Sequence, residues 1–137
     1  MRWLVAVVAM IGLLLGTARA QDDKSMDGTW VMVSGVEMGK KLSEDRVKSA
    51  RLILKGDTHI VEVGGERIKG THTVDAKKKP KTIDATETEG ANKGKTMLGI
   101  WETDGDLFKV SFAVPGKERP KDFDSGDIIH VWKRQKK

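Results

Sequence analysis

The 137-residue sequence predicts an all-β fold, an up-and-down antiparallel barrel of about eight strands. Short runs rich in Val, Ile, Thr and Trp recur along the chain, and glycine-containing breaks separate them. A sheet of short strands has two unpaired edges unless it closes, and closure into a barrel removes both. An open sandwich is the second architecture that these observations allow. The runs lie near residues 28–37, 50–55, 57–63, 66–75, 81–88, 95–103, 106–114 and 127–134.

The Gly-Gly pair at 64–65 lies between two alternating runs and predicts a β-hairpin. Both glycines can take positive φ without strain, as a two-residue hairpin turn requires. In this register Val63 faces Glu66 and Val61 faces Ile68.

A second hairpin is predicted around the Asp-Gly pair at 104–105. One face of this hairpin is strongly apolar and the other is mixed, as expected for a sheet with one buried face. The predicted register pairs Trp101 with Phe108, Gly99 with Val110 and Met97 with Phe112.

One stretch, from Leu42 to Val47, has helical character. Ser43 can cap a short helical turn near residues 43–48, with Arg46 and Lys48 on its polar side.

The first twenty residues have the three regions of a secretory signal. Arg2 gives the charged start, an apolar run follows from Trp3 to Leu15, and Ala18-Arg19-Ala20 gives a small-residue exit. A membrane anchor is the alternative, but the apolar run is shorter than the roughly 20 residues that span a bilayer. We therefore expect cleavage after Ala20, export to the periplasm or the outside of the cell, and no transmembrane segment afterwards.

Residues 21–137 are expected to form one domain, long enough to bury a core without disulfides or metals. The chain contains no cysteine, so stability must come from packing and backbone pairing. The net charge of +5 for the full chain includes Arg2 and Arg19, so residues 21–137 carry +3, a mild excess whose visible clusters lie at residues 77–81 and in the tail 133–137. Because nucleic-acid binding needs basic residues interleaved with aromatic ones, we expect these charges to be solvated and no nucleic acid to bind.

The start of this domain, Asp27-Gly28-Thr29-Trp30, resembles the Gly-x-Trp opening of lipocalin-type barrels. In lipocalins an arginine near the last strand packs across that tryptophan and closes the barrel base. Arg134 has the matching position here, so the resemblance implies a structural pair of Trp30 and Arg134.

The wider pattern resembles a more specific group, a lipocalin-like domain family of exported bacterial proteins found chiefly in planctomycetes. The resemblance implies a small lipocalin-like barrel and no established activity. This chain departs from the family pattern at Trp101, where members often have Tyr, and at Ser111, where they often have Cys. The matching segments are Gly28-Thr29-Trp30, Gly39-Lys40-Lys41, Pro80-Lys81-Thr82-Ile83-Asp84, Gly99-Ile100-Trp101-Glu102 and Arg119-Pro120-Lys121-Asp122-Phe123.

The interior of an eight-stranded barrel is either filled by side chains or wide enough for one small ligand. Both interpretations stay open for this chain. A cavity would suit a small hydrophobic molecule. The residues expected to line the interior are Met97, Trp101, Phe108, Val110 and Phe112.

Two histidines are the weak candidates for a metal site. The Gly-Gly hairpin register places His59 opposite Gly70 and His72 opposite Asp57, so both rings lie diagonally on one face. Asp57 could complete a site, but stable zinc sites normally have three or four protein ligands. We therefore expect ordinary strand residues, no bound metal and no cofactor.

No arrangement of residues indicates catalysis. Gly-x-Ser-x-Gly is absent, and Asp122, Asp124 and Asp127 lack the spacing of a calcium-binding hand. The sequence thus predicts a protein that is not an enzyme. In the loop 115–126 we expect Arg119 to bond loop carbonyls and latch the loop, rather than to bind an anion.

Besides an enzyme, which would need a polar arrangement that the sequence does not show, two functions remain from different classes. The first is a non-catalytic exported lipocalin-like protein that binds a small hydrophobic ligand inside the barrel. The second is an envelope structural or interaction protein with a filled barrel core, whose loops bind a protein partner. An empty or hydrated cavity favours the first, and a filled interior with an exposed apolar patch favours the second.

Overall fold

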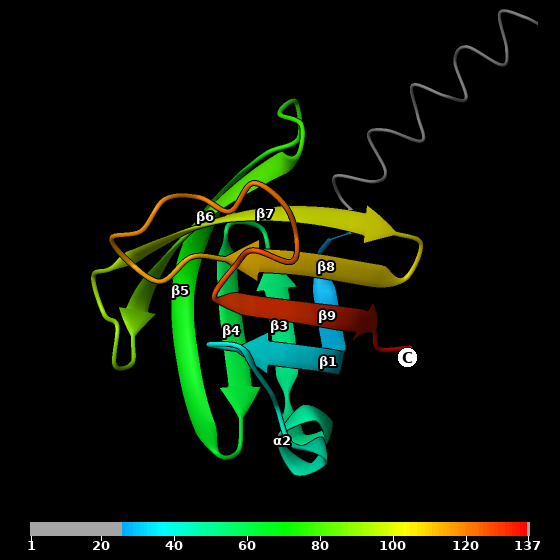
Figure 1. The fold of residues 1–137 in the computed structure, drawn as a ribbon. Helices are drawn as coiled ribbons and strands as arrows, with labels where there is room; N and C mark the ends of the chain where they lie inside the picture. Colours follow the sequence, from blue (N-terminus) through cyan, green and yellow to red (C-terminus); the bar gives the residue numbers. More distant parts are fainter. Residues whose placement is uncertain (1–25, 137) are drawn as a thin grey trace, which may run out of the picture.

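The computed structural model describes residues 26–136, which form nine strands and one short helix (Figure 1). The secretory signal predicted for residues 1–20 lies outside the described residues. The elements are β1 (Gly28–Glu37), β2 (Lys40–Lys41), α2 (Glu44–Ser49), β3 (Arg51–Lys55), β4 (Thr58–Val63), β5 (Glu66–Asp75), β6 (Lys81–Glu89), β7 (Thr96–Asp104), β8 (Leu107–Phe112) and β9 (Ile128–Arg134). No helix among them is long and apolar enough to cross a membrane.

The strands close into an eight-stranded antiparallel barrel. From β3 to β9 each strand pairs with the next one in sequence, and β1 pairs with both β3 and β9. Figure 1 shows this closure, with β1 in cyan beside β9 in red. The two-residue β2 adds only to the end of β1. The predicted all-β up-and-down barrel is therefore confirmed, and the open sandwich is excluded.

The short helix α2 forms where the sequence predicts a helical turn. The Ser43 side chain accepts a hydrogen bond from the backbone N–H of Arg46 at 3.3 Å, which caps the first turn. Glu44 and Asp45 lie in that first turn, where carboxylates complement the helix dipole.

The first hairpin has the predicted register. Gly64 and Gly65 take φ values of 57° and 86°, as a type I′ turn requires. Val63 faces Glu66, and Val61 faces Ile68.

The predicted register of the second hairpin is wrong by two residues. Asp104 pairs with Leu107, so the turn is made by Gly105 and Asp106. Gly105 is the first central residue of this turn and has a φ of 60°, as a type II′ turn requires. The sequence had predicted a turn with Asp104 and Gly105 as its central residues. Because the shift is an even number of residues, each side chain keeps its face. The true pairs are Trp101 with Val110, Gly99 with Phe112, and Thr103 with Phe108.

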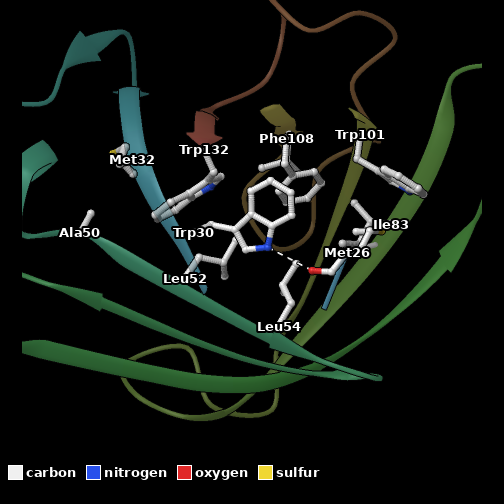
Figure 2. Close-up of a cluster of buried hydrophobic side chains, with 11 residues drawn as sticks. Met26, Trp30, Met32, Ala50, Leu52, Leu54, Ile83, Trp101, Phe108 and Trp132 are labelled. Carbon is white, nitrogen blue, oxygen red and sulfur yellow. Dashed lines mark hydrogen bonds between the residues drawn. The ribbon is translucent and has the colours of Figure 1, made fainter. Parts of the chain in front are cut away.

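Trp30 is the centre of the packed base of the barrel. It is fully buried, its indole N–H donates to the Met26 carbonyl at 3.0 Å, and its ring lies 5.7 Å from that of Phe108 (Figure 2). Trp132 and Leu54 pack in the same cluster. The base is therefore filled with aromatic and aliphatic side chains that exclude water.

The Arg134 guanidinium lies over the Trp30 ring, with its carbon atom 4.3 Å from the ring centroid. Its Nη1 also donates to the Asp27 carbonyl at 2.8 Å. The structure thus places these two residues as the lipocalin resemblance implies, with the cation on the outer side of a buried indole.

The connection between β8 and β9 is held to the barrel wall by Arg119. Its Nη1 donates to the carbonyls of Ile83 on β6 and Gly99 on β7, at 3.1 and 2.8 Å. Its Nη2 binds the Asp84 carboxylate at 2.7 Å. The predicted latching role is consistent with these bonds, but the acceptors belong to two strands rather than to the loop.

Candidate ligand cavity

The barrel interior is hollow beyond the packed cluster at its base. A cavity of about 290 Å³ lies between the strands, and most of its lining is aliphatic or aromatic. The apolar lining residues are Met26, Leu52, Leu54, Val61, Val63, Ile68, Ile83, Ala85, Met97, Phe108, Val110, Phe112, Ile128 and Trp132. The same cavity is bordered by polar side chains, which fall into three groups.

Four of the five residues expected to line the interior border this cavity, namely Met97, Phe108, Val110 and Phe112. Trp101 does not. It is buried beside Phe108, with the two ring centroids 6.2 Å apart, and its indole N–H donates to the Thr82 carbonyl at 2.9 Å. Figure 2 shows Trp101 within the packed cluster, so its role is to fill the barrel.

The first polar group marks the mouth of the cavity. Arg46 of α2 and Glu66 of β5 are both exposed and both line the cavity, so this end reaches solvent. Glu37 and His130 form a pair at 2.8 Å on the facing wall. The hydrogen bond from His130 lowers the pKa of Glu37, and the positive charge of Arg46 contributes in the same direction. Glu37 is therefore an ionised carboxylate that has a hydrogen-bond partner in His130.

The second polar group is the pair His59 and His72. Their Nδ1 atoms lie 3.1 Å apart, and both side chains are buried. Burial lowers the pKa of His59 to about 4, and the neighbouring His72 acts in the same direction. Burial also lowers the pKa of His72, against the opposing effect of a hydrogen bond to the Gly56 backbone. Both rings are thus neutral near pH 7, with one Nδ1–H donating to the other Nδ1.

The predicted third partner of the histidines, Asp57, contributes through its backbone. Its carbonyl accepts a hydrogen bond from the backbone N–H of His72 at 2.8 Å. Among residues 26–136, no group of three or more His, Asp or Glu side chains is arranged to hold a metal ion. The two histidines are better described as a neutral hydrogen-bonded pair in the cavity wall.

Gly70 makes room for this pair. It is opposite His59 on β4 and opposite Glu87 on β6. A Cβ at this position would lie 2.7 Å from His59 Nε2 and would also overlap the Thr86 carbonyl. The His59 ring therefore lies over the glycine, on the same interior row as Glu87.

The third polar group is Glu87, which the sequence predictions missed. Its side chain lines the cavity and is only 6% exposed. Its Oε2 atom is inaccessible to solvent and has no hydrogen-bond partner within the described part of the chain. Burial raises the pKa of its carboxyl group, and a hydrogen bond with the Asn92 backbone only partly opposes this. Strand alternation was the available signal, because Ile83, Ala85 and Glu87 all point inward.

Comparison of the chain with family models, with curated proteins and with solved structures found no match. Functional inference for this protein therefore rests on the geometry of the barrel and its cavity.

Proposed function

We propose that this protein is an exported, non-catalytic, lipocalin-like carrier that binds a small, mainly apolar molecule inside its barrel. The observation that supports the proposal is the cavity of about 290 Å³. This volume is near the lower limit of roughly 300–1,000 Å³ typical of small-molecule sites. A ligand smaller than a typical drug molecule would suit such a space.

The distribution of side chains supports the same proposal. Apolar residues from most of the strands surround the cavity, so they would release water when the body of a ligand enters. The polar side chains are fewer than the apolar ones and lie in small groups, so they can orient a ligand whose body is apolar. The charged residues Glu37, Arg46 and Glu66 gather at the mouth, where a ligand would enter.

The alternative is an envelope protein whose filled barrel serves as a platform for partner-binding loops. It would be favoured by a filled interior and a continuous exposed apolar patch. The large apolar side chains that are exposed lie on separate elements, at Val33, Met38, Val74 and Leu107. Together with the cavity, this dispersed surface favours the carrier.

A cavity-filling substitution tests the carrier function. Ala85 is buried and lines the cavity, so Ala85→Leu would occupy the space that a ligand needs. We expect this variant to remain folded and to lose about tenfold or more in affinity for an apolar fluorescent probe. Ala76→Leu, at an exposed turn position, is the matched control and should bind as the parent protein does. Equal probe binding by both variants would contradict a site inside the barrel.

Export is tested separately. The proposal expects the protein in the host periplasm or medium to begin at Gln21, which intact-mass measurement of the purified protein can establish. A cytoplasmic protein that retains residues 1–20 would contradict it.

A further inference from the structure

We propose that the cavity prefers a small amine, whose ammonium group pairs with the Glu87 carboxylate while its apolar part fills the barrel. This inference rests on the proposed carrier function and specifies the ligand class of the same site.

Glu87 is the group in the cavity that requires a partner. Its Oε2 atom is buried and has no hydrogen-bond partner among residues 26–136, and the interior alternation of β6 directs the side chain to the cavity. Leaving a buried acceptor unpaired is unfavourable, and more so when the acceptor is charged. A ligand that brings a hydrogen-bond donor to the Glu87 carboxylate would relieve that penalty on binding.

The other charges around the cavity favour a cationic donor. The Glu37 carboxylate is hydrogen-bonded to His130 and feels the positive charge of Arg46, whereas Glu66 is exposed at the mouth. Within residues 26–136, no basic side chain forms an ion pair with Glu87. A cation for Glu87 must therefore come from the ligand, and a carboxylate ligand would be repelled.

The two histidines support the same ligand class. Since both rings are neutral, they do not supply a positive charge to Glu87. The two Nδ1 atoms face each other at 3.1 Å, so the hydrogen bond between the rings uses neither Nε2 atom. His59 Nε2 lies above Gly70, on the interior row of Glu87, and accepts a hydrogen bond in the tautomer that carries its proton on Nδ1. An ammonium group has three donors and can use more than one acceptor.

Apolar side chains surround Glu87 and would hold the rest of the ligand. Ala85 precedes it on the interior face of β6 and pairs with Met97 on β7. Ile68 borders the cavity from β5. The site therefore combines an acid that has no ion-pair partner within residues 26–136 with an apolar wall, a pattern that suits an alkyl or aryl amine.

The test compares three probes that share a carbon chain and differ in the head group. Hexylamine, hexanol and hexanoate are titrated into the full mature protein by calorimetry near pH 7. We expect hexylamine to bind roughly tenfold or more tightly than hexanol, because a charge-assisted hydrogen bond is stronger than a neutral one. Hexanoate should bind most weakly.

The variant Glu87→Gln keeps the shape of the side chain and removes its charge. It should bind hexylamine about tenfold more weakly than the parent, with little change for hexanol. Glu89→Gln removes the same charge from an exposed position of the same strand, so it should retain the preference for the amine. Equal binding of hexylamine and hexanol by the parent protein would overturn the amine inference and leave the carrier function intact. No binding of any of the three probes would overturn the carrier function itself.

A measurement on the parent protein keeps the inference testable if Glu87→Gln does not fold. The ratio of hexylamine to hexanol affinity should fall as pH is lowered, because protonation of Glu87 removes the partner of the ammonium group. The other charged or titratable groups of the cavity are Glu37, Arg46, His59, Glu66, His72 and His130. Repeating the titration on Glu66→Gln tests whether the exposed Glu66 causes the pH dependence of the affinity ratio. A ratio that does not depend on pH would contradict pairing with Glu87.

Discussion

Arg134, at the end of β9, covers the indole ring of Trp30 near the start of β1, with its guanidinium carbon 4.3 Å from the ring centroid. These two strands are the first and the last of the barrel and pair with each other, so the contact lies at the closure itself. It joins the ends of the described chain by side chains as well as by backbone hydrogen bonds.

Replacing this arginine should therefore destabilise the barrel. We expect Arg134→Met to lower the free energy of unfolding by about 1–2 kcal/mol, from loss of the cation–π contact and of the hydrogen bond to the Asp27 carbonyl. Urea unfolding measures the loss. Lys133→Met, at the exposed neighbouring position, is the control and should change stability by less than about 0.5 kcal/mol. Similar losses in the two variants would argue against a specific role for the Trp30 contact.

Gly70 should not accept even a methyl group. Its Cβ would overlap the Thr86 carbonyl and approach His59 Nε2 to 2.7 Å, so either the backbone or the histidine pair must move. Gly70→Ala is expected to cost about 2–3 kcal/mol, in the upper range for an overpacked core. The exposed neighbour Thr71→Ala should have a small effect in the same unfolding assay. Wild-type stability in Gly70→Ala would mean that the His59 ring does not lie over this glycine.

Arg119 should be indispensable for fixing the loop between β8 and β9. Arg119→Met removes three hydrogen bonds, one of them to the Asp84 carboxylate, and should cost about 2 kcal/mol. Arg119→Lys should not restore stability, because a single ammonium group cannot reproduce the planar fork that meets three acceptors. Lys121→Met, at an exposed position of the same loop, is the control. Full rescue by lysine would show that charge alone is required.

The histidine pair predicts that the protein loses stability in mild acid. In the unfolded chain His59 has a pKa near 6.5, whereas burial lowers it to about 4 in the folded protein. The unfolded state therefore binds more protons below about pH 6.5, and the free energy of unfolding falls as pH decreases toward 4. His59 alone is expected to lower the free energy of unfolding by about 2 kcal/mol between pH 7 and pH 5. His72 acts with the same sign, since burial lowers its pKa too.

Urea unfolding at these two pH values, with His59→Gln as the comparison, checks this prediction. The variant should lose much of the acid sensitivity. Glu87 opposes the effect, because burial raises its pKa and protonation relieves the cost of its buried charge. Glu37 contributes at lower pH, since the stability from its lowered pKa is lost only as pH falls below about 4.5. Stability that rises steadily from pH 7 to pH 5 would contradict a neutral histidine pair.

The local chemistry of the chain predicted the barrel because turns and alternation are short-range features. The Gly64-Gly65 turn fixed the register of its hairpin, and Ser43 fixed the start of α2. The register of the second hairpin was harder to predict, because two adjacent turns are possible within Asp104-Gly105-Asp106. The structure uses the later one, with Gly105 and Asp106 as its central residues. The choice depends on interactions beyond the turn, such as the bond from the Arg134 N–H to the Asp106 carbonyl.

The cavity was less predictable than the fold. Strand alternation identified Phe108 and Val110 as interior residues, but not which interior residues pack together and which border an open space. Trp101 lies in the interior as alternation predicts, but its contacts with Phe108 and with the Thr82 carbonyl place it in the packed cluster rather than at the cavity. Alternation did mark Glu87 as inward-facing, but its burial without a partner is a property of the closed barrel.

The central claim, that the barrel carries a small molecule, is tested most directly by native mass spectrometry. The protein would be purified without detergent from its own host and measured before and after solvent extraction. The carrier function predicts a discrete added mass that disappears on extraction, and an amine would be its expected class. A protein that has only its apo mass, and that gains none when incubated with small amines, alcohols and acids, would contradict the claim.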